Sequence, residues 1–188
     1  MIPNNVIEFE DMVFTDAGML ANFLDNHDVP RFVNQAGENS IKKLKAALTY
    51  LMTTRGIPVI YYGTEAAMNG GADPDNRRDM DWNEEPVLAE YLKQLSGIRR
   101  ENSAFTHGDY ISLEGNVVGF IRKDGDEYAI VFINNTDKIV DETFDLPNDL
   151  GIKDGKLKDS ISGVSHIDIN GNKVQVKLDP YQTAIYEP

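Results

Sequence analysis

Asn26, His27 and Asp28 are adjacent polar residues that follow the apolar pair Phe23-Leu24 after one further acidic residue, Asp25. A carboxylate beside an imidazole can move protons or stabilise positive charge that develops in a transition state. In parallel barrels the catalytic groups gather at the carboxyl ends of the strands, so a strand ending before Asn26 would place all three residues there. Asp and Asn also close strands as turn formers, and the cluster alone leaves both interpretations open.

The segments around this cluster predict alternating strands and helices. Residues 19–24 are expected to form a strand that delivers the cluster. Apolar residues recur at helical spacing over residues 40–55, with Asn39 or Ser40 as the cap and Gly56 as the stop. The apolar run 57–62 then predicts a second strand, buried on both faces and paired in parallel. This order is typical of β/α units.

A second polar segment follows the second strand. Residues 69–82 are too rich in turn formers and charge for regular structure and predict a long loop, the usual place for functional residues after a barrel strand. Asn83 is expected to cap a helix that tolerates Pro86 in its first turn and ends near Arg100.

The pattern changes period from about Gly108 onwards. Short β-rich runs separated by turns predict strands at the segments 117–122, 128–133, 143–146, 173–178 and 183–186. We therefore expect an α/β part, residues 1–106, followed by a small antiparallel β-sandwich domain, residues 107–188.

Composition excludes several functions. The 188 residues include 31 acidic and 18 basic side chains, and the net charge of −13 would repel nucleic acid and anionic membranes. The sequence contains no cysteine, and its three histidines are too scattered to predict a metal site. No apolar run approaches the roughly 18 residues that a membrane span requires. The sequence gives no cellular location.

Three motifs together resemble the alpha-amylase family of glycoside hydrolases. They are Asn26-His27-Asp28, the segment from Gly56-Ile57-Pro58 to Gly63-Thr64-Glu65, and Gly71-Ala72-Asp73-Pro74-Asp75-Asn76-Arg77. Their order and spacing are similar to the seventh and eighth units of that family's (β/α)8 TIM barrel, and the β-rich tail is similar to the sandwich that follows it. The form of the third motif leans towards cyclodextrin-active and maltogenic members.

The resemblance implies roles in binding an α-glucan oligosaccharide. Asp28 would stabilise the oxocarbenium-like transition state, and His27 would donate hydrogen bonds to the same sugar. Asp73 and Arg77 match positions that hold a sugar further along, with Asn26 and Arg31 as further substrate-binding residues. From the residues alone, Asp73 could equally be a turn former, and Arg77 could simply pair with Asp73 or Asp79. The aromatic residues Tyr61, Tyr62 and Trp82 could stack on sugar or belong to the core.

In this family the nucleophile lies in a Gly-x-Arg-x-Asp motif and the general acid is a Glu on another strand, and neither is found here. Two β/α units also leave strand edges open. We therefore expect the carboxyl-terminal portion of a retaining enzyme acting on α-1,4-glucans, inactive alone, with either self-association or a missing amino-terminal portion. The alternatives are a non-catalytic glucan-binding module and an assembly subunit. No cofactor is expected in this chain, and a calcium ion of the parent enzyme cannot be assigned to it.

Overall fold

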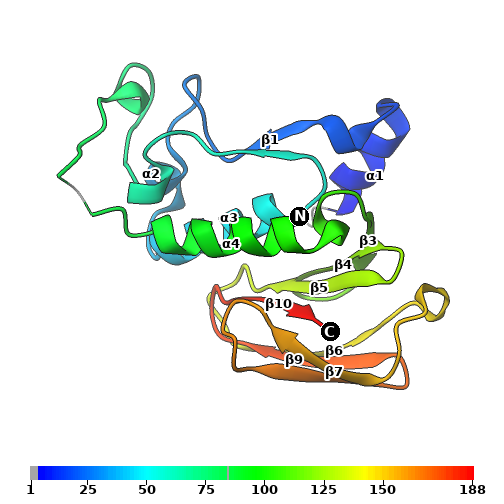
Figure 1. Cartoon of the computed structure of the whole chain (residues 1–188). Helices are drawn as coiled ribbons and strands as arrows, with labels where there is room; N and C mark the ends of the chain where they lie inside the picture. The colour runs from blue at the N-terminus through cyan, green and yellow to red at the C-terminus, as the bar shows by residue number, and fades with distance from the viewer. Residues whose placement is uncertain (1–3, 84) are drawn as a thin grey trace.

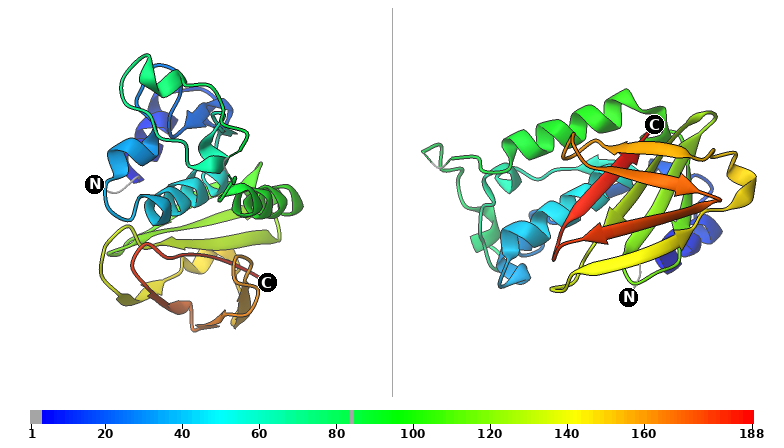
Figure 2. Two further views of the ribbon diagram at one scale, coloured as in Figure 1. Left: turned by 90° about the vertical axis from the view of Figure 1, so that its left-hand side faces the viewer. Right: turned by 90° about the horizontal axis from the view of Figure 1, so that it is seen from below.

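The computed structural model describes residues 4–83 and 85–188. Helices and long loops form one part, and an antiparallel sheet beneath them forms the other (Figures 1 and 2). The helices are α1 (Asn4–Val13), α2 (Phe32–Ala36), α3 (Ser40–Thr53) and α4 (Ala89–Glu101). The strands are β1 (Ala21–Phe23), β2 (Ile57–Val59), β3 (Asp109–Leu113), β4 (Val118–Asp124), β5 (Glu127–Ile133), β6 (Val140–Asp145), β7 (Gly155–Asp159), β8 (His166–Asn170), β9 (Lys173–Leu178) and β10 (Thr183–Glu187). Within the described ranges, no helix is long and apolar enough to cross a membrane.

Strands β1 and β2 pair in parallel, with Ala21 opposite Ile57, as the sequence predicts. Both are shorter than expected, and the prediction that β2 is buried on both faces is wrong. Phe23, Ile57 and Val59 are 49%, 46% and 43% exposed. A two-stranded sheet has two open edges, and these apolar side chains face outwards.

Helix α3 confirms its prediction to within two residues. Its apolar face is buried through Leu44, Leu48 and Leu51, which recur at the spacing of successive helical turns. Asn39 precedes the helix in the left-handed conformation. The helix ends at Thr53, and Gly56 then takes a φ of 96°, which favours glycine and turns the chain into β2.

Helix α4 begins later than predicted. The Asp81 side chain accepts hydrogen bonds from Asn83, so Asn83 belongs to a turn instead of capping the helix. Pro86 also lies outside the helix, and Leu88, fully buried, donates its N–H to the carbonyl of Glu65. This contact fixes Leu88 five residues beyond the predicted cap Asn83, and α4 follows from Ala89.

The antiparallel part is one eight-stranded sheet with the order β3-β4-β5-β10-β7-β8-β9-β6. It folds over into two facing layers, joined through β10 (Figure 2). The sandwich and its five predicted strands are therefore present, although the sequence pattern missed β3, β7 and β8. Buried and exposed residues alternate in β7 and β8, but the only buried apolar residues of these strands are Leu157, Ile167 and Ile169. Their many polar residues therefore obscure the apolar pattern that predicts a strand.

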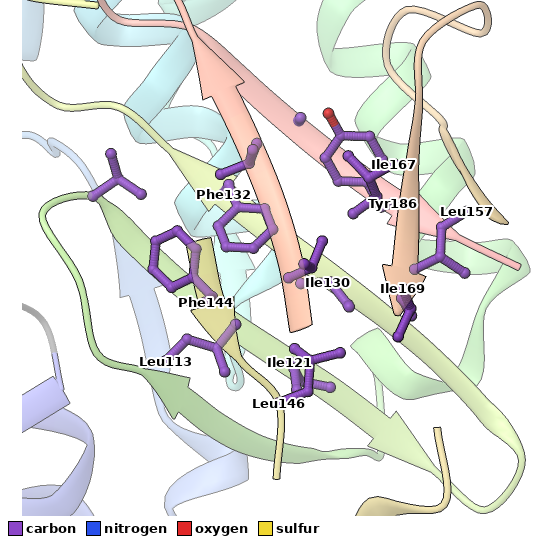
Figure 3. Close-up of a cluster of buried hydrophobic side chains, with 14 of the residues drawn as sticks. Leu113, Ile121, Ile130, Phe132, Phe144, Leu146, Leu157, Ile167, Ile169 and Tyr186 are labelled. Atoms are coloured by element: carbon purple, nitrogen blue, oxygen red, sulfur yellow. The ribbon is translucent and has the colours of Figure 1, made fainter. Parts of the chain in front are cut away.

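The β4–β5 layer separates two cores. Ile121 and Phe132 point into the sandwich, where Phe132 lies 4.8 Å from Phe144 between ring centroids (Figure 3). Their strand neighbours Phe120 and Val131 point the other way and pack beneath the helices. Because successive side chains of a strand face opposite sides, this one layer connects the helical part to the sandwich.

Two arginines fasten the same junction. Arg122 of β4 is buried and donates to the carbonyls of Thr53 and Gly108, both at 2.8 Å. Arg99 of α4 donates to the carbonyls of Met52 and Gly56, at 2.9 and 2.7 Å. Burial lowers the pKa of Arg122 to about 10, with a further contribution from the nearby Arg99 charge, so it remains protonated at neutral pH. The C-terminal end of α3 therefore contacts the positive charges of Arg99 and Arg122, which interact favourably with the negative end of the helix dipole.

Candidate active-site cluster

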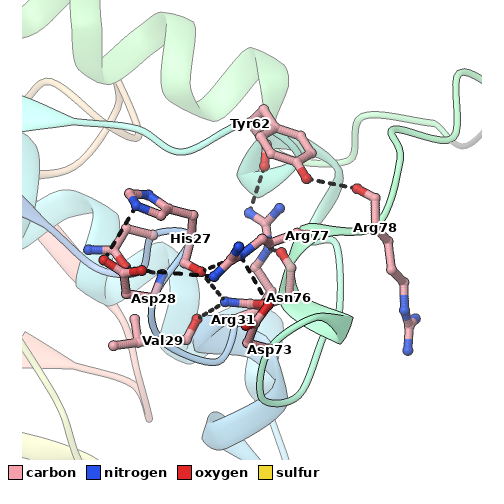
Figure 4. Close-up of polar contacts among 10 residues, drawn as sticks. His27, Asp28, Val29, Arg31, Tyr62, Asp73, Asn76, Arg77 and Arg78 are labelled. Atoms are coloured by element: carbon pink, nitrogen blue, oxygen red, sulfur yellow. Dashed lines mark hydrogen bonds and ion pairs between the residues drawn. The ribbon is translucent and has the colours of Figure 1, made fainter.

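The two polar motifs meet at the carboxyl end of the β1–β2 pair (Figure 4). The contact is made by Asn76, which is fully buried and donates its Nδ2 hydrogens to the carbonyls of His27 and Val29, at 2.9 and 3.0 Å. Arg77 adds an Nε–H bond of 2.8 Å to the same His27 carbonyl. The loop that carries Asp28 is thus held by its main chain, leaving its side chains available.

His27 and Asp28 are the most open groups of the cluster. His27 Nε2 lies 3.3 Å from Asp28 Oδ2, and the two side chains are 63% and 68% exposed. Arg77 Nη2 lies 3.9 Å from Asp28 Oδ1 on the other side of the carboxylate. His27 and Arg77, which come from two motifs about fifty residues apart in sequence, therefore flank the exposed carboxylate of Asp28.

Asp73 lies beside the same arginine. Its Oδ1 is 3.1 Å from Arg77 Nε, which is one of the two ion pairs that the residue types alone allow. The neighbouring Asp75 shapes the loop: it accepts a 2.6 Å bond from the Gly71 N–H and a bond from Arg78 Nε. The Gly71 N–H, and next the Arg78 guanidinium, lower the pKa of Asp75.

Arg31 differs from its expected role. Its side chain is 1% exposed and faces the interior, whereas the sequence prediction places it against sugar. It donates to the carbonyls of Asn76 and Tyr62, at 2.9 and 2.6 Å, and its guanidinium stacks 4.1 Å from the centroid of the Tyr61 ring. Arg31 therefore connects its own loop to the loop of Asn76 and to the segment that follows β2.

The turn at Asn26 is built locally. Asn26 Oδ1 accepts a 2.8 Å bond from the N–H of Asp28, and the buried Asp25 accepts a 2.7 Å bond from the N–H of Phe32 at the start of α2. Asn26 is half-buried, so its side chain both closes the turn and borders the cluster.

The nearby aromatic residues differ in their contacts, and none of them belongs to the two hydrophobic cores of the described residues. Tyr61 and Tyr62 contact each other, with ring centroids 4.6 Å apart, and cover the Arg31 guanidinium. Tyr62 also donates from its hydroxyl to the Arg78 carbonyl. Trp82 is largely exposed. The tyrosines are thus part of the support of the loops, while Trp82 is open to solvent.

Sequence reasoning missed Asn76 and Asp25. Asn76 lies within a segment whose composition predicts a turn, and its burial was not visible in the pattern. Asp25 precedes the motif directly, and its acidic side chain at the end of an apolar run was the available signal. Both act through hydrogen bonds to main-chain groups of the loop, which residue types alone do not reveal.

Chemically, the cluster can bind hydroxyl groups and stabilise positive charge. Asp28 offers carboxylate oxygens, and His27 and Arg77 offer donors on either side of it. In the described ranges, no three or more His, Asp or Glu side chains converge on a position that could hold a metal ion.

Comparison with known proteins identifies the family. Residues 5–108 match the model of the alpha-amylase catalytic domain. The beta/alpha-amylase of Paenibacillus polymyxa is 37% identical over 187 residues, covering 94% of this chain and 15% of that protein. A cyclomaltodextrin glucanotransferase of Geobacillus stearothermophilus is 34% identical, covering 71% of this chain and 19% of that protein. The chain thus spans less than a fifth of the length of these two relatives.

A solved structure agrees over nearly the whole chain. The alpha-amylase of Geobacillus thermoleovorans, complexed with acarbose, superposes with a TM-score of 0.88 at 34% identity, covering 98% of this chain and 42% of that one. The chain belongs to the alpha-amylase family. Its fold is that of the carboxyl-terminal part of the family structure, the last β/α units followed by an antiparallel sandwich.

Proposed function

We propose that this chain supplies part of the sugar-binding site of a retaining glycosidase that acts on α-1,4-glucans. We further propose that the chain is inactive alone. The observation that carries the proposal is the meeting of Asp28, His27 and Arg77, which come from two distant motifs. In this proposal residues 1–106 are the carboxyl-terminal part of the catalytic barrel, and residues 107–188 form a separate sandwich domain.

The chemistry follows from the arrangement. A sugar undergoing cleavage acquires positive charge at its anomeric carbon, and the exposed Asp28 carboxylate would stabilise it. His27 would donate to hydroxyls of the same sugar, while Asp73 and Arg77 would hold the next sugars, with Asn26 at the border. A retaining mechanism needs two further carboxyl groups about 5 Å apart, and the sequence lacks the motif that carries the nucleophile.

The decisive experiment is complementation. The purified chain should not turn over soluble starch or cyclodextrin, whereas its mixture with the amino-terminal part of an alpha-amylase that contains the nucleophile and acid should do so. Asp28→Asn should abolish that turnover, and Asp168→Asn, an exposed carboxylate on the sandwich, should leave it unchanged. Turnover by the chain alone that survives Asp28→Asn would show the proposal to be wrong.

A non-catalytic glucan-binding module is the second candidate. The observation in its favour is the exposure of His27, Asp28 and Arg77, which leaves the cluster open to an oligosaccharide without any partner. Titration calorimetry with maltoheptaose separates the two readings. Binding that disappears in Asp28→Asn supports this candidate, and no heat at millimolar sugar removes it.

The open β1–β2 sheet predicts a protein partner. Its outward apolar side chains and its two free strand edges would be covered by a complementary part of a barrel or by a second copy of the chain. This partner is part of the proposal. Turnover restored in the complementation experiment would report the binding of the complementary barrel part.

A further inference from the structure

A cavity lies away from the Asp28 cluster, between the helices and the sandwich. It has a volume of about 450 Å³, within the range of small-molecule sites. Ala46 and Ala47 of α3 and Val118 and Ile133 of the sheet line it with aliphatic side chains, which we call its apolar floor. Three aromatic residues, Phe32, Tyr50 and Tyr181, complete the apolar part of the lining.

Tyr181, which lines this cavity, has a strained backbone conformation. Tyr181 has a φ of 60°, the left-handed region that residues with side chains rarely adopt. Its N–H donates to the Thr136 carbonyl, and the buried Asn134 ties the same two loops by donating to the carbonyls of Lys138 and Asp179. Strain held this firmly by its surroundings is characteristic of functional positions.

The polar groups of the cavity are few and distinctive. Among the described residues that line it, Lys43 is the one that carries a charge, and Asn135 contributes an amide. The Lys43 ammonium lies 5.5 Å from the centroid of the Tyr181 ring and donates to the Ala36 carbonyl at 2.7 Å, which fixes its position and leaves two of its hydrogens for a ligand. An apolar floor with one fixed cation complements a ligand that has an apolar body and one negative charge.

We propose that this cavity binds a small amphipathic carboxylate, with its acyl or aryl body between Tyr181 and the α3 alanines and its carboxylate at Lys43 and Asn135. An oligosaccharide fits less well, because hydroxyls surround every sugar ring and the alanine, valine and isoleucine side chains of the floor would leave them unpaired. The lining of this site shares no residue with the Asp28 cluster, so the two sites can be tested separately.

Octanoate is a suitable probe, titrated into the full chain and followed by calorimetry and by NMR shifts of Ala46 and Tyr181. Binding should be saturable, and octanol, which lacks the charge, should bind at least about fivefold more weakly. Lys43→Gln should weaken octanoate by a similar factor. The matched control is Lys42→Gln, since Lys42 is an exposed lysine one residue away that does not line the cavity.

Ala47→Phe should fill the cavity and abolish binding, while Asp28→Asn should not change it. Because Ala47→Phe could disturb folding, the NMR shifts of the unaltered chain provide a second test: they should move at Ala46 and Tyr181 and stay constant at His27. Absence of saturable binding, or binding that Lys43→Gln and Lys42→Gln weaken equally, would overturn the proposal. Maltoheptaose shifting the same resonances would overturn the choice of ligand.

Discussion

At the scale of single residues, the cluster depends on side chains that never reach its surface. Asn76 binds the main chain on both sides of Asp28, at His27 and Val29. Arg31 in turn holds the Asn76 carbonyl. The geometry of the exposed carboxylate is therefore determined by a buried amide and a buried guanidinium.

Replacing Asn76 by Asp should loosen this loop. The carboxylate is of equal size but presents acceptors to the carbonyls of His27 and Val29, and we expect a local destabilisation of about 1–3 kcal/mol. Hydrogen exchange at the amides of residues 26–29 and of Arg31 should accelerate about tenfold to a hundredfold, since Pro30 has no amide hydrogen. Asn83→Asp, at an exposed turn, is the control and should leave these amides unchanged. Equal protection in both variants would contradict the role of Asn76.

The loop around Asp75 should respond to acid. Since hydrogen bonds from Gly71 and Arg78 lower the pKa of Asp75, its contribution to loop stability is complete above the usual Asp pKa of about 3.9 and is lost as pH falls through the lowered value. The Gly71 amide proton shift should therefore titrate with a midpoint below about 3.9. Asp75→Asn should remove the titration. A midpoint at or above the usual value would refute this prediction.

The residue types in the sequence indicated which exposed side chains form the cluster, but they did not indicate the buried side chains that hold its loops in place. The pairing of Arg77 with Asp73 was one of the alternatives visible in the sequence. Arg31 was not predicted correctly, because an arginine beside a polar motif suggests a ligand contact, whereas burial and stacking on Tyr61 depend on the folded chain. The functional roles of Asp28, His27 and Asp73 stay predictions.

At the scale of elements, the end of α3 links the cluster to the sandwich. Arg122 comes from the sandwich and binds the Thr53 carbonyl, and Gly56, which Arg99 binds, is the residue before β2. The position of β2, and with it the start of the second loop, thus depends on arginines from α4 and β4.

Arg122→Met should show this dependence. The variant keeps an apolar stem but leaves the carbonyls of Thr53 and Gly108 without their donor, and we expect a loss of about 2–4 kcal/mol in the free energy of unfolding. Urea denaturation followed by circular dichroism measures it. Arg100→Met removes an exposed arginine of α4 and should change stability by less than about 0.5 kcal/mol. Similar losses in both variants would argue against a specific junction.

Helices and strands were predictable where apolar residues recur at every position that the helical or strand period requires. Helix α3 has an apolar face and a glycine stop, and β9 alternates so regularly that its bounds were predicted without error. The start of α4 was wrong because a turn at Asp81 and a tertiary contact of Leu88 override the local signals. Strands such as β8, with two buried apolar residues among five, carry too little pattern to be recognised alone.

At the scale of the whole molecule, the exposed β1–β2 face should govern association. Phe23 and Val59 lie opposite each other at the end of the register, and both are exposed. We expect concentration-dependent self-association of the isolated chain, measured by sedimentation or light scattering. Val59→Lys should weaken it by about tenfold, since a charge would be buried at the contact.

Val164→Lys provides the matched control, because Val164 is an exposed valine in a turn of the sandwich. It should leave association unchanged. A chain that stays monomeric at high concentration, or one whose association both substitutions weaken equally, would contradict the assignment of the contact to the β1–β2 face.

The place of β10 in the sheet has a kinetic consequence. It is the hydrogen-bonded link between β5 and β7, yet it follows β6, β7, β8 and β9 in the chain. During synthesis β5 must wait for a partner that leaves the ribosome after four other strands, so its edge stays unpaired meanwhile. Pairings across such sequence separations are slow. The sandwich is therefore expected to fold late, as one event triggered by the arrival of β10.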